Sequence, residues 1–152
     1  MGGHLACHDC PRHFAERNEL EHHKLTHLPL TVRCLCCPRY FGTFFGMVIH
    51  LESGICESGV NLPFLNRLAA QCYQWKKYLS KEYRNELLAG DTGYREVSAQ
   101  PFKCPRCEEA FPLLSSMFQH IWSPACGQGQ RGGAIGKLRR WIEKRTYRMR
   151  SR

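Results

Sequence analysis

The sequence predicts a small α+β protein built from three ββα modules, a long middle helix and a basic C-terminal helix. The main observation is a repeat: Cys, two residues, Cys, then Phe four positions and His thirteen positions after the second Cys. Each copy also has Leu or Met three residues before the His. The copies are Cys7/Cys10/Phe14/Leu20/His23, Cys34/Cys37/Phe41/Met47/His50 and Cys104/Cys107/Phe111/Met117/His120.

The composition favours modules held together by metal rather than one large core. The 152 residues have a mean hydropathy of −0.45 and no long apolar run. The first residues show no signal-peptide pattern, so we expect an intracellular chain with reduced thiols and no membrane span. A secreted disulfide framework would not require His at fixed offsets, whereas thiolate and imidazole at this spacing are typical zinc ligands. We therefore expect three Zn²⁺ ions.

In the first module, residues 1–30, the ligands are Cys7, Cys10, His23 and His27. His23 and His27 lie one helical turn apart, so both imidazoles project from the same helix face towards the cysteines. Phe14 and Leu20 form a core too small to hold without metal. We expect Cys10→Ser to unfold this module alone.

The second and third modules, residues 31–60 and 101–127, end differently. They lack a second His and have Cys six positions after the first, which an unbroken helix would rotate away by about 240°. Ser53-Gly54 and Ser123-Pro124 supply the required helix breaks. The ligand sets are Cys34, Cys37, His50 and Cys56 in the second module, and Cys104, Cys107, His120 and Cys126 in the third. We expect Cys126→Ser to unfold the third module alone.

The remaining cysteines and histidines have more ordinary interpretations. Cys36 permits a second register with Cys34, although only Cys37 keeps the repeat spacing. Cys72 lies on an apolar stripe and is expected to be a buried small hydrophobe. His4, His8, His13 and His22 are expected to be exposed. Four protein ligands per ion leave no position for water, so we expect no enzymatic activity.

The first module resembles the Cys2His2 zinc-finger family over Cys7 to Phe14 and Leu20 to His27. The resemblance implies a hairpin-plus-helix fold. The stretch from His50 to Cys56, with a parallel module ending at Cys126 and a helix between, resembles small fungal proteins with one Cys2His2 and two Cys2HisCys fingers. That resemblance covers most of the chain and implies zinc binding and architecture rather than a biochemical role.

Residues 61–90 show the periodicity of one connecting helix. Asn61 can cap it, Pro63 suits its first turn and Gly90 ends it. Such a helix would be about 40 Å long, bridging the second and third modules or bending near Ser80. Its apolar stripe would pack on the fingers or the tail helix, or fill a partner's groove. The stripe consists of Leu65, Leu68, Cys72, Trp75 and Leu79.

Residues 134–152 form a basic amphipathic helix and tail, and they carry much of the net charge of +9. Its apolar residues are Ile135, Leu138, Trp141 and Ile142. Its basic residues are Lys137, Arg139, Arg140, Lys144, Arg145, Arg148, Arg150 and Arg152. This pattern indicates contact with nucleic-acid phosphates, an anionic membrane surface, or a nuclear-import signal. The finger-like modules favour the nuclear interpretations.

The finger positions that read bases are poorly equipped for it. They hold Glu16, Glu19 and His22 in the first module, Thr43, Gly46 and Ile49 in the second, and Leu113, Ser116 and Gln119 in the third. We therefore expect a non-catalytic zinc-binding interaction protein, nuclear or nucleo-cytoplasmic, with a protein partner and sequence-independent nucleic-acid affinity through its tail. The alternative is a sequence-specific DNA-binding regulator that uses the first two fingers.

Overall fold

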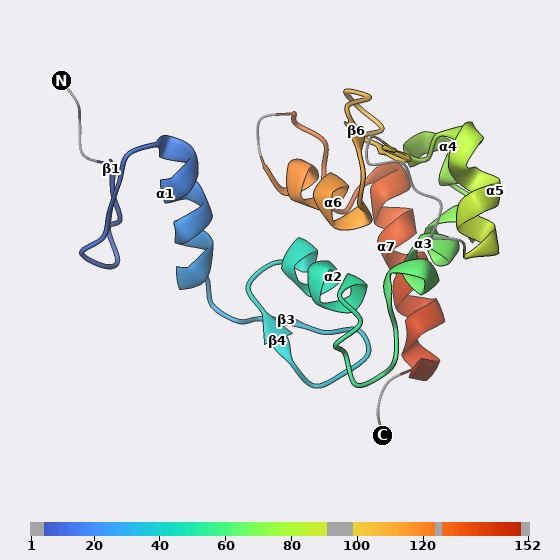
Figure 1. Ribbon diagram of the computed structural model, residues 1–152, viewed down its shortest axis with the longest axis horizontal. Helices are drawn as coiled ribbons and strands as arrows, with labels where there is room; N and C mark the ends of the chain where they lie inside the picture. Colours follow the sequence, from blue (N-terminus) through green and yellow to red (C-terminus); the bar gives the residue numbers. More distant parts are fainter. Residues whose placement is uncertain (1–4, 91–98, 124–125, 150–152) are drawn as a thin grey trace.

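The computed structural model describes residues 5–90, 99–123 and 126–149. It is a small α+β fold in which three short antiparallel hairpins are each followed by a helix (Figure 1). The first module has β1 (Leu5–Ala6), β2 (His13–Phe14), α1 (Arg17–Lys24) and the 3₁₀ turn η1 (Leu25–His27). The second has β3 (Val32–Arg33), β4 (Tyr40–Phe41) and α2 (Phe44–Glu52), and the third has β5 (Phe102–Lys103), β6 (Ala110–Phe111) and α6 (Leu114–Trp122).

The three hairpins share one register. The repeated Phe pairs across the ladder with the residue two positions before the first Cys: Leu5 with Phe14, Val32 with Phe41, and Phe102 with Phe111. The amide of that first Cys donates to a carbonyl five residues later in every copy, namely Cys7 to Arg12, Cys34 to Arg39 and Cys104 to Glu109. The sequence repeat is therefore also a repeat of backbone structure.

The prediction of one long middle helix is wrong. Residues 61–90 form three helices, α3 (Leu62–Gln71), α4 (Trp75–Tyr78) and α5 (Lys81–Ala89). The predicted ends are present, since the Asn61 side chain accepts from the Phe64 amide at 3.1 Å and Gly90 has φ of 72°. The chain leaves helical geometry at Cys72 and Leu79, which are both extended.

Tertiary contacts explain the breaks. The last turn of α3 has its carbonyls satisfied by side chains from other helices: Tyr78 donates to Ala69, Arg84 to Ala70 and Trp141 to Leu68. Leu79 forms a β-bridge with Phe102, which ties the middle segment to the third hairpin. The apolar stripe is thereby packed inside the protein and is not left for a partner.

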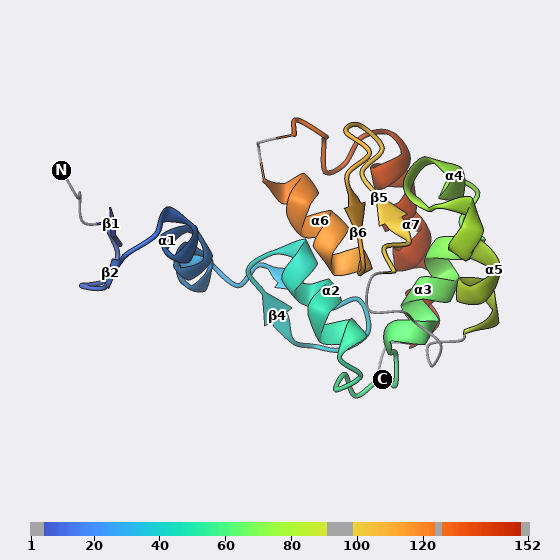
Figure 2. The same ribbon diagram turned by 45° about the horizontal axis from the view of Figure 1, so that its top comes forward.

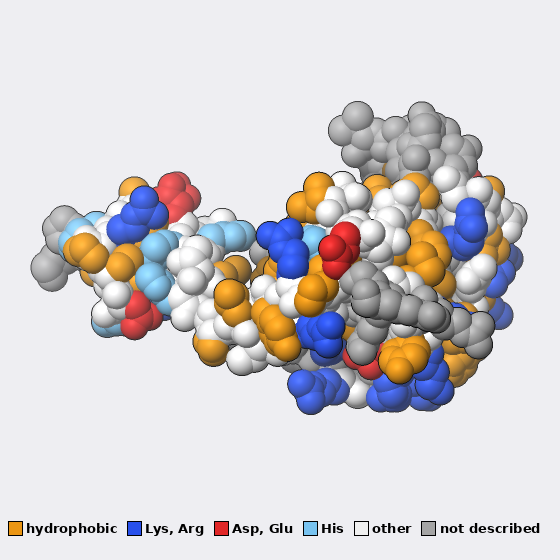
Figure 3. Space-filling model, turned by 90° about the horizontal axis from the view of Figure 1, so that it is seen from below, with side chains coloured by type: hydrophobic (Ala, Val, Ile, Leu, Met, Phe, Trp, Pro, Cys, Tyr) orange, Lys and Arg blue, Asp and Glu red, His pale blue; other side chains and the backbone are white. Residues whose placement is uncertain are grey.

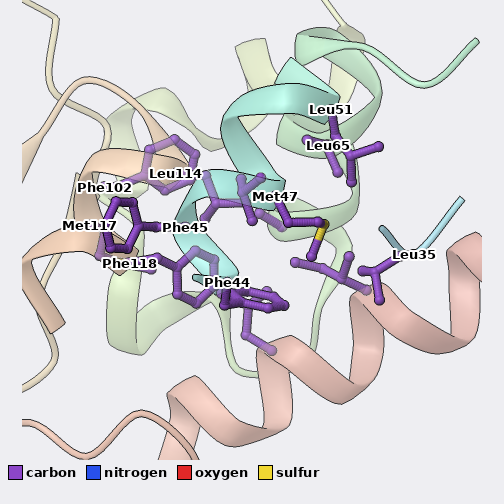
Figure 4. Packing of buried hydrophobic residues seen from close by; sticks show 14 of the residues in the cluster. Leu35, Phe44, Phe45, Met47, Leu51, Leu65, Phe102, Leu114, Met117 and Phe118 are labelled. Atoms are coloured by element: carbon purple, nitrogen blue, oxygen red, sulfur yellow. The ribbon is translucent and has the colours of Figure 1, made fainter. Parts of the chain in front are cut away.

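The second and third modules share one core with the middle helices and the C-terminal helix α7 (Gly133–Thr146), which continues into the 3₁₀ turn η2 (Tyr147–Met149). Figure 4 shows Phe44, Met47 and Leu51 of α2 packed among core residues from other segments. The expectation that the chain lacks a common core is therefore wrong for this part, which we call the body. Ile135, Leu138 and Ile142 anchor α7 in it.

The first module stands apart from the body, as Figures 1 and 2 show, and forms a separate lobe in the space-filling view (Figure 3). Leu20 is the buried residue of its helix, while Leu25 packs partly against the common core. Leu28 lies beside Gly42 of the second module. None of the described helices is long and apolar enough to cross a membrane.

Candidate metal centres

The structure gathers the twelve expected ligands into three groups of four. In each group, the Cys Sγ and His ring nitrogen atoms lie within 4.8 Å of one another. The groups are Cys7, Cys10, His23 and His27; Cys34, Cys37, His50 and Cys56; and Cys104, Cys107, His120 and Cys126. Each is positioned to hold one zinc ion.

The distances within the groups suit tetrahedral zinc. Bond lengths of about 2.3 Å to sulfur and 2.0 Å to nitrogen place two sulfurs about 3.8 Å apart, and sulfur about 3.5 Å from nitrogen. Cys104 and Cys126 have sulfurs 3.7 Å apart, and the Cys37 sulfur lies 3.6 Å from Nε2 of His50. In the first group, Nε2 of His23 lies 3.0 Å from Nε2 of His27, so both imidazoles present the same type of nitrogen.

The repeated Phe orients the first His of every group. Ring centroids are separated by 4.9 Å for Phe14 and His23, 4.9 Å for Phe41 and His50, and 5.0 Å for Phe111 and His120, with interplanar angles of 36°, 37° and 39°. This packing directs Nε2 towards the cysteines. Phe is therefore part of the metal site as well as of the core.

In the second and third modules the helix ends before the last Cys ligand, so the chain can turn back towards the metal group. Helix α2 ends at Glu52, where the Ser53 hydroxyl donates to the His50 carbonyl at 2.6 Å, and Gly54 turns the chain with φ of 80°. In the third module, α6 ends at Trp122 and Ser123 is already extended. The expected break at Pro124 lies outside the described residues.

Burial of the second group changes the pKa values of its thiols. All four of its ligands are buried, and burial raises the pKa of Cys34 to about 12. Burial also acts on Cys56, but hydrogen bonds with Ser58, Cys37 and Cys34 together outweigh it and lower the pKa of that thiol. A divalent cation compensates the buried thiolates, although three thiolates and one imidazole leave a formal charge of −1.

Two supporting residues were not foreseen. The Glu109 carboxylate lies 3.4 Å from Nδ1 of His120 and can fix the ring orientation, while the Ser58 hydroxyl donates to the Cys56 sulfur at 3.1 Å. The positions equivalent to Glu109 hold Arg12 and Arg39. Because neither residue recurs between modules, the repeat gave no signal for them.

The other cysteines are structural. Cys36 is fully buried outside the second group, and its amide donates to the Cys34 sulfur at 3.4 Å. Cys72 is also fully buried. All ten cysteines are free, which excludes the disulfide framework in this structure. His8, His13 and His22 are exposed as expected, and His4 lies outside the described residues.

The base-reading positions differ between the modules. Helices α2 and α6 pack side by side in antiparallel orientation (Figure 2), with Phe44 against Phe118 and Phe45 against Trp122. This packing covers much of both helices, and Thr43 is buried. The corresponding residues of the first module, Glu16, Glu19 and His22, are all exposed.

The basic side of α7 is exposed except at one position. Lys137, Arg140, Lys144 and Arg145 are exposed. Arg139 is not, because its guanidinium carbon lies 3.9 Å from the centroid of the Phe44 ring and burial lowers its pKa. Arg139 is therefore only partly exposed, and its contact with nucleic acid stays a prediction. The Arg148 side chain, Arg150 and Arg152 lie outside the described residues.

Comparison with known proteins gives one weak match. The chain is 24% identical over 134 residues to "Zinc finger protein 1" of Drosophila melanogaster, covering 83% of this chain and 12% of that protein. No family model matches, and no solved structure matches. The match and the three Cys/His groups together fit a zinc-finger-like protein.

Proposed function

We propose that this chain is a non-catalytic zinc-binding interaction protein of the nucleus, which attaches to nucleic acid without sequence preference through α7 and contacts a protein partner through its first module. The anchoring of α7 carries the proposal. Its apolar side is buried in the body, so Lys137, Arg140 and Lys144 form a fixed basic face. Contacts from such a face to phosphates are independent of base sequence.

The same anchoring argues against membrane attachment. An amphipathic helix binds a bilayer by inserting its apolar side between the lipids. In α7, Ile135, Leu138 and Ile142 of that side are at most 1% exposed. Trp141 is half-buried against the core, and its ring nitrogen donates to the Leu68 carbonyl. Insertion would require α7 to leave the core.

The finger helices support a role other than base reading. The major groove is about 12 Å wide and a helix with side chains measures about 10–12 Å, so paired α2 and α6 are too wide to enter together. The first module stands free, but Glu16 and Glu19 would repel phosphate. Exposed carboxylates at these two positions are better suited to a protein partner.

The groups of four ligands support a structural role for zinc. A catalytic zinc keeps an open coordination position for water, and four protein ligands fill a tetrahedral ion. The Drosophila melanogaster relative is named as a zinc finger protein. It adds weight to zinc binding and leaves the partner open.

A salt titration of DNA binding tests the proposal. Changing Lys137, Arg140 and Lys144 to Gln should lower the affinity equally for a given duplex and for a duplex of scrambled sequence. It should also reduce the slope of log K against log salt by up to about 3. The control removes the same charge at exposed positions elsewhere: Arg17, Arg33 and Lys81. Equal losses of affinity in both triple variants would show that binding depends on net charge alone and not on α7. A preferred duplex that survives the α7 changes would support the DNA-reading alternative.

The protein contact needs a separate test. Tagged full-length protein, treated with nuclease, should retain a partner that is lost on changing Glu16 and Glu19 to Lys. The matched control changes two exposed carboxylates elsewhere on the surface, Glu57 and Glu82, to Lys. If both pairs of changes leave the captured proteins unaltered, the first module is not the contact site.

A further inference from the structure

The segment before α7 folds back onto the helix and presents an arginine beside it. A Cβ added at Gly136 would overlap the carbonyl oxygen of Arg131, so a glycine at this position permits the close approach. Arg139 also holds the segment, because its guanidinium donates to the Gln130 carbonyl at 3.2 Å. Arg131 is therefore placed by the fold next to α7, although it lies outside that helix.

Three arginines then line one surface hollow. Arg131, Arg139 and Arg140 lie around it with Gly136, and Glu143 is the single carboxylate of the lining. Among the described residues, no ion pair involves any of the three guanidiniums. The lining thus has two positive charges more than negative ones.

The Arg139 side chain is held in place at the hollow by two contacts. Its guanidinium is held between the Phe44 ring and the Gln130 carbonyl, and it is only partly exposed. Burial and the neighbouring Arg131 lower its pKa, which Glu143 partly offsets. A cation held beside like charge at a partly dry surface is stabilised by a bound anion.

We propose that Arg131, Arg139 and Arg140 form a phosphate-binding cradle for the sugar-phosphate backbone of a nucleic acid. Planar guanidiniums bind phosphate oxygens in pairs, which a lysine cannot do. Nucleic acid is favoured over a phospholipid surface because α7 has no free apolar side to insert. The inference rests on the proposed function, since it names where on α7 the backbone is held.

A phosphate probe tests the cradle directly. Pyrophosphate titrated into the zinc-loaded full chain should shift the Nε–Hε NMR signals of Arg131, Arg139 and Arg140, and leave that of exposed Arg33 unmoved. Uniform small shifts of all arginine signals would overturn the cradle.

Matched double variants test its use by nucleic acid. Changing Arg131 and Arg140 to Gln should weaken duplex binding about tenfold, clearly more than changing Lys137 and Lys144 to Gln, which removes equal charge. Changing Arg131 and Arg140 to Lys should still cost roughly fivefold, because charge alone is retained. Equal losses in the two Gln pairs, or no loss in the Lys pair, would overturn the cradle while leaving the basic face of α7 intact.

The remaining outcomes separate the cradle from the broader proposal. Absence of any duplex binding by the unchanged protein would overturn both. Binding to phosphatidylserine vesicles in place of duplex would also overturn both, and would indicate a lipid surface as the source of phosphate.

Discussion

The Glu52 carboxylate accepts a hydrogen bond at 3.1 Å from the backbone amide of Ser115, which lies 63 residues later in the chain. Glu52 is the last residue of α2, and Ser115 lies in the first turn of α6. The first amides of a helix have no partner within it, so the second module caps the helix of the third.

The opposite end of the helix pair has the equivalent contact. Counted from the metal-binding His, Ser115 and Phe45 both lie five residues before it, and Glu52 and Trp122 both lie two residues after it. Phe45 packs against Trp122 with centroids 5.6 Å apart. The antiparallel helices α2 and α6 thus pair through equivalent positions at both ends, with a polar contact at one end and an aromatic one at the other.

The cap makes a specific prediction for Glu52. Replacement by Ala leaves the Ser115 amide without its acceptor and should lower the free energy of unfolding of the body by about 1–2 kcal/mol. Replacement by Gln keeps an oxygen acceptor, so it should not cause this loss. Urea unfolding of the zinc-loaded protein at pH 7.5, followed by tryptophan fluorescence, measures both.

The pH dependence of Glu52 strengthens that comparison. Burial raises the pKa of its carboxyl, so the folded state holds the proton to higher pH than the unfolded state does. Stability from this group therefore falls as pH rises through that window, and above it the buried charge remains a penalty. The Glu52→Gln change removes the penalty and should match or exceed the original stability at pH 7.5. A Gln variant as unstable as the Ala variant would show that the charge itself is needed.

The sequence predicted what is local to each module. The spacing within one repeat predicted a hairpin followed by a helix, and three groups of Cys and His side chains that the structure brings together. The break at Cys72 could not be found in this way, because the stripe from Leu65 to Leu79 fits an unbroken helix without Gly or Pro. It depends on Trp141 and Arg84 satisfying carbonyls of α3 across the fold.

The common core escaped prediction for a similar reason. Average hydropathy does not reveal that Met47, Met117 and Leu138 belong to one buried cluster, since the sequence pattern assigned them to two separate modules and the tail helix. Arg139 was assigned to the solvent side of α7 because helical periodicity cannot show that Phe44 lies above it.

Loss of one ligand should have different consequences in the first and third modules. Cys10→Ser should remove one zinc and leave the thermal unfolding of the body unchanged, because the first module has its own small core. Cys126→Ser should lower the unfolding temperature of the body and weaken the second centre, since α6 packs directly on α2.

Native mass spectrometry and tryptophan fluorescence check this difference. Trp75, Trp122 and Trp141 are the three tryptophans of the chain and all lie in the body, so the fluorescence reports on the body alone. A body that melts unchanged in the Cys126→Ser variant would show that the third module is independent after all.

The joint between the first module and the body depends on Gly42. A Cβ at this position would lie 3.1 Å from the Leu28 Cβ, so Gly42→Val should push η1 away from the second module. We expect faster, independent tumbling of the first module in ¹⁵N relaxation, with three zinc ions retained. Gly129→Val, where the nearest atom is 4.0 Å away, is the control. Unchanged tumbling in the Gly42→Val variant would mean that another contact holds the lobe.

Zinc binding at the second centre should release protons and weaken as the pH falls. Without metal, burial holds the pKa of Cys34 at about 12, so its thiol is protonated in both the folded and unfolded states at pH 7. Zinc requires the thiolate and must displace that proton. Burial, helped by Arg39, lowers the pKa of His50, so its imidazole is neutral at pH 7 and contributes no proton.

The stability that zinc confers is therefore present at neutral pH and is lost on acidification, as protons displace the metal from the thiolates. Calorimetry in two buffers of different ionisation enthalpy should show more than one proton released per zinc at the second centre; zinc affinity that is constant from pH 6 to 8 would contradict thiolate ligation there.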